Sequence, residues 1–391
     1  MAINLTNADS ALKSVYLDAI SEQLDTSASP FMAAIEKTSN HVWGKEVKMN
    51  VVHGFNGGVG AGNEDGSLPR ANANGYAELT ATLKNLYGVI EISDKAVRAS
   101  ENNAGAFVNV LNTEMEGLIN SSKFNLGRML FGNGDGVVAT VTSASGGIYV
   151  SSVSGLYEGM LIDFLQPDGT PIEKGRARRI VSIDRGDRKF SIAGEALTYE
   201  DIPFGTLVTM QGSYGQEITG LSAIFDANID TIYGLKKSEN SFLNPYICEE
   251  AGDFTENTIQ IALDSIEEAS GSRPNFIICS WGVRRTLQKI LSATHRTLDT
   301  MELAGGYTAM SYNGIPIVVD RFCPKYTMYL LNTEDFRLHQ LCDWQWLADD
   351  DGRVLKQIPG KPVYTATLVK YAELICSRPY GQGVIKGIEE K

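Results

Sequence analysis

The chain has 391 residues, of which 43% are hydrophobic and 21% charged, close to the usage of ordinary globular proteins. Its net charge of −13 argues against a general nucleic-acid binder, whose affinity depends on Lys and Arg, and against a peripheral protein of anionic membranes. The sequence contains neither a membrane-spanning apolar run nor a signal peptide. Five widely spaced cysteines predict neither a zinc site nor a disulfide framework and fit a reducing cytoplasm.

The first 85 residues predict a helix and then a β-hairpin. One apolar helical face, which Asp9 or Ser10 can cap, consists of Leu12, Val15, Tyr16, Ala19, Ile20 and Leu24. A short apolar segment, Phe31 to Ile35, follows. Val47, Met49 and Val51 then alternate with polar residues, and the stretch from Tyr76 to Ile92 alternates again, which is typical of half-buried strands.

The segment between these strands, GFNGGVGAGNEDGSLPRANANG, contains seven glycines and four asparagines. Its only large apolar side chains are Phe55, Val59 and Leu68. A structureless loop of this length is uncommon in a compact domain. We interpret it as the tip of a long two-stranded arm, which must lean on other structure because an isolated hairpin is marginally stable.

The longest periodic signal predicts a helix from Ala104 to Phe131, about 40 Å long at 1.5 Å per residue. Its apolar stripe indicates a face that packs on the core, and GNGDG at 132–136 ends the helix. Short β-type runs separated by turns then fill 137–212, which predicts a small all-β barrel or sandwich. Its basic stretch, Lys174 to Lys189, favours a solvated or salt-bridged face over a nucleic-acid site.

The remainder of the sequence predicts mixed α/β structure. Asp253 and Glu256 have capping-box spacing before a helix that contains Ile259, Ala262, Leu263 and Ile266. The segments NFIICS, GIPIVVD and YTMYLLN predict strands, and Ser280 can cap a second helix. The tail, 336–388, returns to β-type runs such as VYTATLVKYAELIC.

No catalytic, cofactor or metal site is predicted. The sequence contains no complete GxGxxG, no GxxxxGK[ST] and no GxSxG, and its four histidines lack metal-ligand spacing. Asp349 to Asp351 form only half a calcium loop, so a solvated turn is the better interpretation. The Arg185-Gly186-Asp187 tripeptide lies where a hairpin turn is needed.

The order of these elements resembles the major capsid protein of tailed bacteriophages, whose fold is shared with herpesvirus shells and encapsulins. The local similarities are SPFMAAI, GLSAI, RPNFIICSWGVRRTLQKI, NGIPIVVDRFCPKYTMYLLNTEDFRL and LVKYAELICSRPYGQGVIKGI. The resemblance implies an α+β capsid fold with this division of the chain: N-terminal arm 1–40, extended hairpin or E-loop 41–85, peripheral domain with a spine helix 86–136, inserted β-domain 137–212, axial α/β domain 213–335 and a return to the peripheral domain 336–391.

The same resemblance implies a structural protein, not an enzyme, that forms hexamers and pentamers of an icosahedral shell around double-stranded DNA. Phe55, Leu68, Pro69 and Arg70 would contact a neighbouring subunit. Partners would include a portal protein and a decoration protein. Because only about 40 residues precede the arm, we expect either a separate scaffolding protein or a chain in its processed form. The acidic chain would enclose DNA without sequence-specific binding, in a virion assembled in the host cytoplasm.

Some members of that family join subunits through a lysine on the arm, but no lysine lies between Lys48 and Lys84. We therefore expect a non-covalent shell. Three alternatives remain at this point: an encapsulin-like compartment, an acidic multidomain hydrolase with an unrecognised site, and a β-rich binding module on a scaffold.

Overall fold

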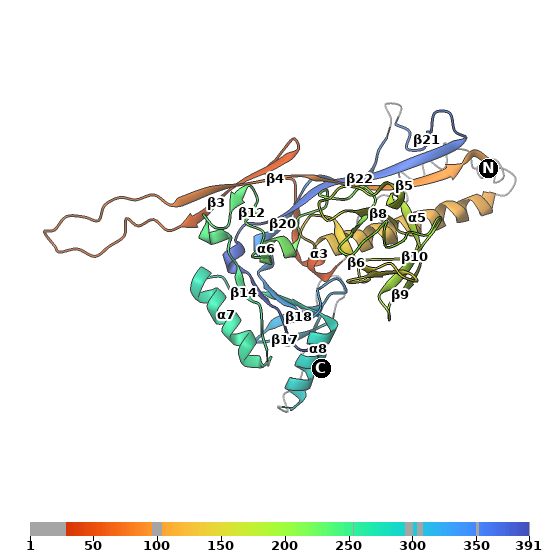
Figure 1. Ribbon diagram of the computed structural model, residues 1–391. Coiled ribbons are helices and arrows are strands. Elements are labelled where there is room, and N and C mark those ends of the chain that lie inside the picture. The colour runs from red at the N-terminus through yellow and green to blue at the C-terminus, as the bar shows by residue number, and fades with distance from the viewer. Residues whose placement is uncertain are drawn as a thin grey trace.

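The computed structural model describes residues 29–95, 104–252, 254–293, 300–302, 308–348 and 352–390. The helix predicted around Leu12 to Leu24, the residue Asp253 and the Asp349–Asp351 turn lie outside these ranges. The described residues form a body with two sheets, a separate barrel and an arm that extends far from the body (Figure 1). The α+β class expected from the sequence is confirmed.

The first sheet of the body is built around one long strand, β22 (Val363–Cys376), whose bounds match the predicted VYTATLVKYAELIC run. β22 pairs antiparallel with β20 (Phe336–Trp346) on one side and with β5 (Lys84–Ser93) on the other. Shorter strands complete the sheet, namely β1 (Glu36–Thr38) and β21 (Lys356–Gln357). Phe31 packs edge-on against Phe336 at 5.3 Å, which fixes the helical turn α3 (Pro30–Ala34) on this sheet.

The long helix α5 (Ala104–Met129) packs against β5. Met115, Leu126 and Met129 of its predicted apolar stripe are buried. The helix ends at Met129, two residues before the end predicted at Phe131. The N–H of Gly132 donates to the Met129 carbonyl at 3.0 Å. The glycine-rich segment therefore ends the helix, as its composition predicts.

The second sheet has seven strands in the order β14-β23-β19-β15-β18-β17-β16. Their bounds are β14 (Tyr246–Cys248), β15 (Phe276–Cys279), β16 (Thr300–Glu302), β17 (Thr308–Tyr312), β18 (Ile315–Val319), β19 (Met328–Leu331) and β23 (Gly383–Ile385). Two helices, α7 (Glu256–Ser270) and α8 (Trp281–Ala293), share one hydrophobic cluster with Ile277 and Cys279 of β15, whereas Phe276 and Ile278 join the main core. Both faces of β15 are therefore buried, as its uninterrupted apolar run requires.

One prediction for this region needs correction. The N-cap of α7 is Thr255, not Asp253, and its backbone N–H donates to Thr258 Oγ1 at 3.2 Å. A threonine pair thus replaces the expected acidic capping box. After β22 the turn η4 (Pro379–Gly381) redirects the chain, and β23 pairs with β14 and β19 of the second sheet. The predicted cap of α8 is confirmed: Ser280 Oγ accepts from the N–H of Val283 at 3.4 Å.

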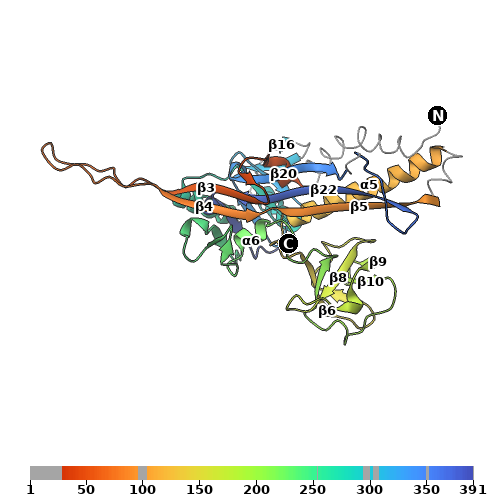
Figure 2. The ribbon, with the colours of Figure 1, turned by 90° about the horizontal axis from the view of Figure 1, so that it is seen from above.

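The inserted segment forms a closed barrel in the order β10-β7-β6-β11-β8-β9. The bounds are β6 (Val137–Ser143), β7 (Ile148–Val150), β8 (Leu161–Leu165), η1 (Glu173–Gly175), β9 (Arg178–Asp184), β10 (Lys189–Ile192) and β11 (Leu207–Met210). The barrel has a hydrophobic cluster of its own and stands beside the body in Figure 2. Its basic stretch forms exposed ion pairs, such as Lys174 with Asp201 at 2.8 Å, and the Arg185–Asp187 tripeptide forms the turn between β9 and β10.

Short elements connect the insert to the second sheet. They are α6 (Leu221–Phe225), β12 (Thr231–Ile232), β13 (Leu235–Lys236) and η2 (Ser241–Leu243), while η3 (Thr333–Asp335) precedes β20.

Candidate functional site

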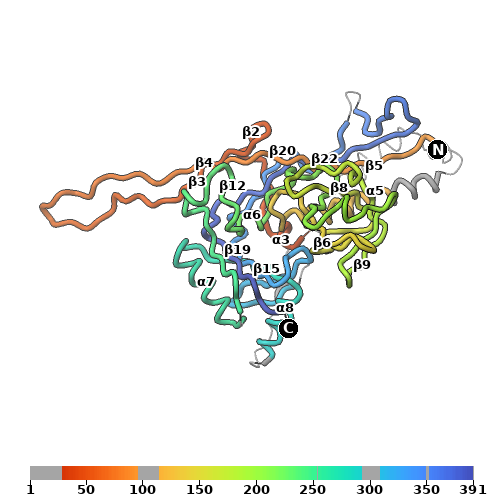
Figure 3. The backbone as a smooth tube through the Cα atoms, viewed as in Figure 1, coloured from red at the N-terminus to blue at the C-terminus, as the bar shows by residue number. Residues whose placement is uncertain are grey.

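The arm is a β-hairpin that continues as an unpaired loop. β3 (Glu46–Gly54) pairs antiparallel with β4 (Gly75–Thr82), and the pairing ends at Gly54 and Gly75. A short strand, β2 (Val42–Trp43), lies on the other side of β3. In the tube of Figure 3 the two sides of the loop that joins β3 and β4 run outward together, away from the body and the barrel. The arm therefore has a structured base and a separate tip, 55–74.

The base of the arm is fixed to the body by one buried face. Val47, Met49, Val51 and Leu79 join the main hydrophobic core, as the alternation predicts. The N–H of Thr80 donates to the Tyr233 carbonyl at 2.9 Å. These contacts with the body stabilise the base, since a hairpin is only marginally stable alone.

A ring contact at the far end of the base adds to this support. The imidazole of His53 stacks on the Phe242 ring at 4.5 Å with an interplanar angle of 12°. His53 immediately precedes the last paired residue, Gly54. The support from the body therefore extends almost to the point where the loop begins.

The tip presents large apolar side chains to solvent. Phe55 is 101% exposed, Val59 90% and Leu68 89%. Its hydrogen bonds are local, such as the Gly58 N–H to Asn56 Oδ1 at 2.8 Å and the Gly66 N–H to the Asn63 carbonyl at 3.0 Å. Burial removes apolar side chains from water and so stabilises a contact. Among the described residues these side chains have no such contact, so the tip is an exposed apolar surface.

All four residues predicted to contact a neighbour lie in this tip. Phe55 begins the outgoing side, and Leu68, Pro69 and Arg70 lie on the returning side, each exposed. The two sides run close together, since a Cβ added to Gly60 would lie 3.4 Å from Pro69 Cγ. The structure thus places the four residues on one element, and their contact with another subunit stays a prediction.

Exposed aromatic residues at the base of the arm were not predicted from the sequence. Trp43 is 71% exposed and Tyr76 65%, and Tyr76 lies opposite Val52, which is 59% exposed. The signal was present, because Tyr76 is an odd number of positions from buried Leu79 and so belongs to the outer face of β4. These side chains extend the apolar surface of the arm from its tip to its base.

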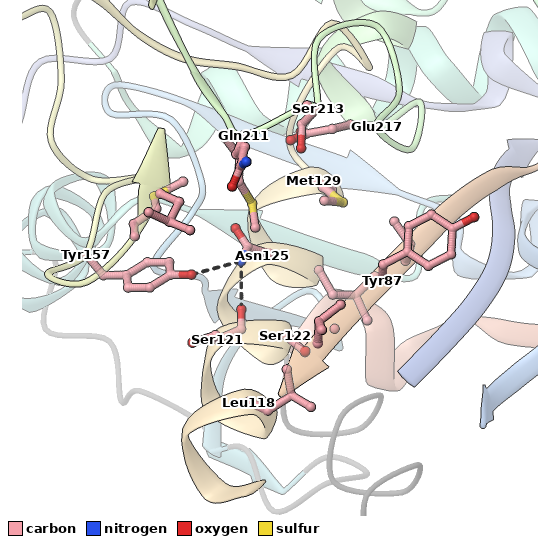
Figure 4. A pocket seen from close by; sticks show the side chains of 18 of the residues that line it. Tyr87, Leu118, Ser121, Ser122, Asn125, Met129, Tyr157, Gln211, Ser213 and Glu217 are labelled. Atoms are coloured by element: carbon pink, nitrogen blue, oxygen red, sulfur yellow. Dashed lines mark hydrogen bonds between the residues drawn. The ribbon is translucent and has the colours of Figure 1, made fainter. Parts of the chain in front are cut away.

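A groove of about 740 Å³ lies between α5, β5 and the inserted barrel (Figure 4). Its lining comes from four stretches far apart in the sequence and from Trp344, and the labelled side chains include Tyr87, Leu118, Asn125, Tyr157 and Gln211. Asn125 Nδ2 donates to the Ser121 carbonyl at 2.9 Å and to the Tyr157 hydroxyl at 3.3 Å. This contact connects the spine helix to the barrel.

Within the ranges that the structure covers, no three His, Cys, Asp or Glu side chains gather in a way that could hold a metal ion. No helix in the same ranges is long and apolar enough to cross a membrane.

Comparison with known proteins gives structural matches alone: no family model matches the chain, and no curated protein matches its sequence. The Cyanophage A-1(L) capsid asymmetric unit matches at 12% identity and a TM-score of 0.57, covering 93% of each chain. The capsid of the empty GTA particle matches at 12% identity and a TM-score of 0.50, covering 93% of this chain and 90% of that one. The chain therefore shares its overall fold with phage capsid proteins.

Proposed function

We propose that the chain is the major capsid protein of a bacteriophage, a subunit that assembles with its own copies into a closed shell. The observation that carries the proposal is the arm tip, whose Phe55 and Leu68 are almost fully exposed at a distance from the body. A soluble chain rarely leaves large apolar side chains together on a protruding loop unless they bind something. The fold shared with capsid proteins supports the same conclusion.

In this proposal the arm lies on a neighbouring subunit. Phe55, Leu68, Pro69 and Arg70 make the contact at the tip, and Trp43 and Tyr76 contribute at the base. Repetition of one such head-to-tail contact generates a ring. Hexamers and pentamers built this way close an icosahedral shell. The glycines of the tip allow the loop to follow a surface that changes during assembly.

The proposed content of the shell is double-stranded DNA, held without sequence-specific contacts. A net charge of −13 favours a wall that repels DNA and lets it pack freely. The further proposed partners are a portal protein, a separate scaffolding protein and a decoration protein. Assembly in the host cytoplasm would lead to a virion whose subunits are joined by non-covalent contacts.

Sedimentation and electron microscopy of the purified chain test this function. Shells or capsomers are the expected result, and a monomer that persists at high concentration would contradict it. Nuclease-resistant DNA in particles from infected cells supports a phage head, whereas an enzyme cargo would indicate an encapsulin-like compartment. A ladder of linked subunits on a denaturing gel would contradict the non-covalent shell.

A further inference from the structure

A second, smaller pocket lies where the spine helix, the insert and the turn between β18 and β19 meet. Its volume is about 410 Å³, at the lower end of the range for sites that bury a ligand. Its lining includes Lys123 and Phe124 of α5, Tyr157 of the insert, and Arg321 and Phe322 of the turn. We call it the aromatic–cationic pocket.

Three aromatic rings form one wall of this pocket. The Phe124 ring meets the Tyr157 ring and the Phe322 ring in T-shaped contacts, each with a centroid distance of 5.0 Å. Such contacts have a preferred geometry, so they hold the rings in position. The wall is therefore built from three parts of the chain that are far apart in the sequence.

Arg321 is held over this wall with its donors unused. Its guanidinium carbon lies 4.8 Å from the centroid of the Phe124 ring and 5.1 Å from that of the Phe322 ring. These contacts use the positive charge and leave the five N–H donors of the group for an acceptor. No ion pair or hydrogen bond connects the Arg321 side chain to any residue that the structure describes. The guanidinium is therefore a positioned fork for an oxyanion.

The other polar groups of the pocket also favour an anion. Lys123 adds a second cation without a carboxylate partner among the described residues. The Tyr157 hydroxyl accepts from Asn125 Nδ2 at 3.3 Å (Figure 4), which leaves its own proton able to donate. The described lining contains no Asp or Glu, and the adjacent Asp320 is buried and accepts from the Phe322 N–H at 2.9 Å. The pocket is thus locally positive in a chain of net charge −13.

The combination of cations and rings favours a carboxylate over a nucleic-acid phosphate. Proteins that bind duplex DNA rely on many phosphate contacts, whereas this concave pocket offers two cations. Single strands stack their bases on open aromatic faces, but Arg321 already lies over the rings of Phe124 and Phe322. An Asp or Glu side chain matches the guanidinium fork, and a neighbouring apolar side chain matches the ring wall.

We propose that the aromatic–cationic pocket binds a short acidic segment of a partner protein. A carboxylate of the segment pairs with Arg321 and Lys123, and an adjacent apolar side chain packs on the rings. Because Phe124 belongs to the spine helix and Tyr157 to the insert, the bound segment contacts both and holds the insert against the body. The proposal goes beyond the proposed shell function and does not require it, because one copy of the chain supplies the whole site.

Two peptides that differ only in charge test the site. The purified full-length chain is titrated by calorimetry with acetyl-FDLE-amide and with its uncharged counterpart acetyl-FNLQ-amide. We expect the acidic peptide to bind about tenfold more tightly, since hydrogen bonds between charged groups are the stronger ones. Equal affinities, or no binding of the acidic peptide, would overturn the proposal.

Matched variants assign the binding to the pocket. Arg321→Gln and Lys123→Gln should each weaken the acidic peptide by about tenfold and leave the uncharged peptide unaffected. The control is Lys325→Gln, which removes an exposed cation of the same turn that does not line the pocket. Melting temperatures show which variants keep the fold, and two variants are used so that one remains informative if the other is unstable. Acidic-peptide affinity that neither pocket variant changes would overturn the proposal.

Competition separates the peptide from other anions. Inorganic phosphate and a short DNA duplex are added to the complex of the chain with acetyl-FDLE-amide. Displacement by either at a concentration below that of the peptide, lost in Arg321→Gln, would indicate a phosphate site and overturn the proposal. Because binding is measured on free subunits, a chain that forms no shell can still bind the peptide, and a chain that forms shells can still fail to bind it.

Discussion

The guanidinium of Arg128 donates two hydrogen bonds to the Glu217 carboxylate, from Nη1 at 2.8 Å and from Nη2 at 2.5 Å. The two side chains are 10% and 4% exposed. Arg128 belongs to the last turn of α5, and Glu217 lies where the chain leaves the barrel. This bidentate pair therefore connects the spine helix to the base of the insert.

Removal of one partner should be strongly destabilising. Glu217→Ala leaves a buried guanidinium unpaired, and we expect a loss of about 3–5 kcal/mol in the free energy of unfolding. The control is Glu239→Ala, which breaks the exposed pair with Lys236 and should cost less than about 1 kcal/mol. Urea denaturation measures both. Equal losses in the two variants would mean that the buried pair contributes no more than a surface pair.

The insert should be separable from the body. Its two ends lie together, since the N–H of Gly215 donates to the Asp135 carbonyl at 2.7 Å, and its core is a cluster of its own. We expect the chain without 137–212, with Gly136 joined to Ser213, to keep a cooperative thermal transition. The isolated barrel should also unfold cooperatively.

The control for this excision is removal of α6 to η2, 221–243. That segment contributes Leu221, Ile224 and Phe242 to the main core, so its loss should abolish the transition. If excision of the barrel also abolishes the transition, the insert is an integral part of the body.

Glu373 makes the stability of the body sensitive to pH. Burial raises the pKa of this carboxyl to about 7 from an ordinary value of 4.5, against the lowering effect of hydrogen bonds from the Thr219 and Leu374 N–H groups. The native state therefore binds more protons than the unfolded state between pH 4.5 and 7. The contribution of Glu373 to stability is fully present below pH 4.5 and is lost as pH rises through about 7.

Glu373→Gln should remove this dependence, because the amide oxygen can still accept both hydrogen bonds without a charge. At pH 8 the variant should be more stable than the wild type, by an amount on the order of 3 kcal/mol. The matched control is Glu91→Gln on the exposed face of β5, which should leave the pH profile unchanged. The free energies of unfolding of both proteins, measured from pH 4 to 8, test this prediction. Parallel pH profiles for Glu373→Gln and wild type would contradict it.

Much of the fold could be predicted because alternation along a strand reports which side is buried. Val47, Met49, Val51 and Leu79 alternate with polar residues, and the structure buries all four. The fate of Gly383 to Ile385 could not be predicted, since an apolar triplet fits either sheet and the turn at η4 decides between them. Lys370 is also beyond sequence reasoning: it is fully buried, and its ammonium group lies 2.6 Å from Asp343 Oδ1.

The candidate site was also predictable from the sequence only in part. The composition of 54–75 was sufficient to predict an arm tip, because glycine and asparagine cannot form a core. The groove was not predictable, because β5, α5 and two edges of the barrel meet only in three dimensions. Asn125 Oδ1, which is buried and has no hydrogen-bond partner among the described residues, is likewise a result of that packing and leaves no mark in the sequence.

The arm tip should matter for assembly and not for folding. Phe55→Ser and Leu68→Ser remove side chains that are almost fully exposed, so we expect unfolding free energies within about 0.5 kcal/mol of wild type. The same variants should raise the subunit concentration needed for assembly, because each removes an apolar contact that forms only between copies. The control is Val181→Ser on the barrel, a side chain 56% exposed and outside both the arm and the groove. Sedimentation over a range of concentrations measures the effect: equal assembly by all three variants would show that the apolar tip is not a subunit contact, and a loss of folding stability in the tip variants would show that the loop packs on its own chain.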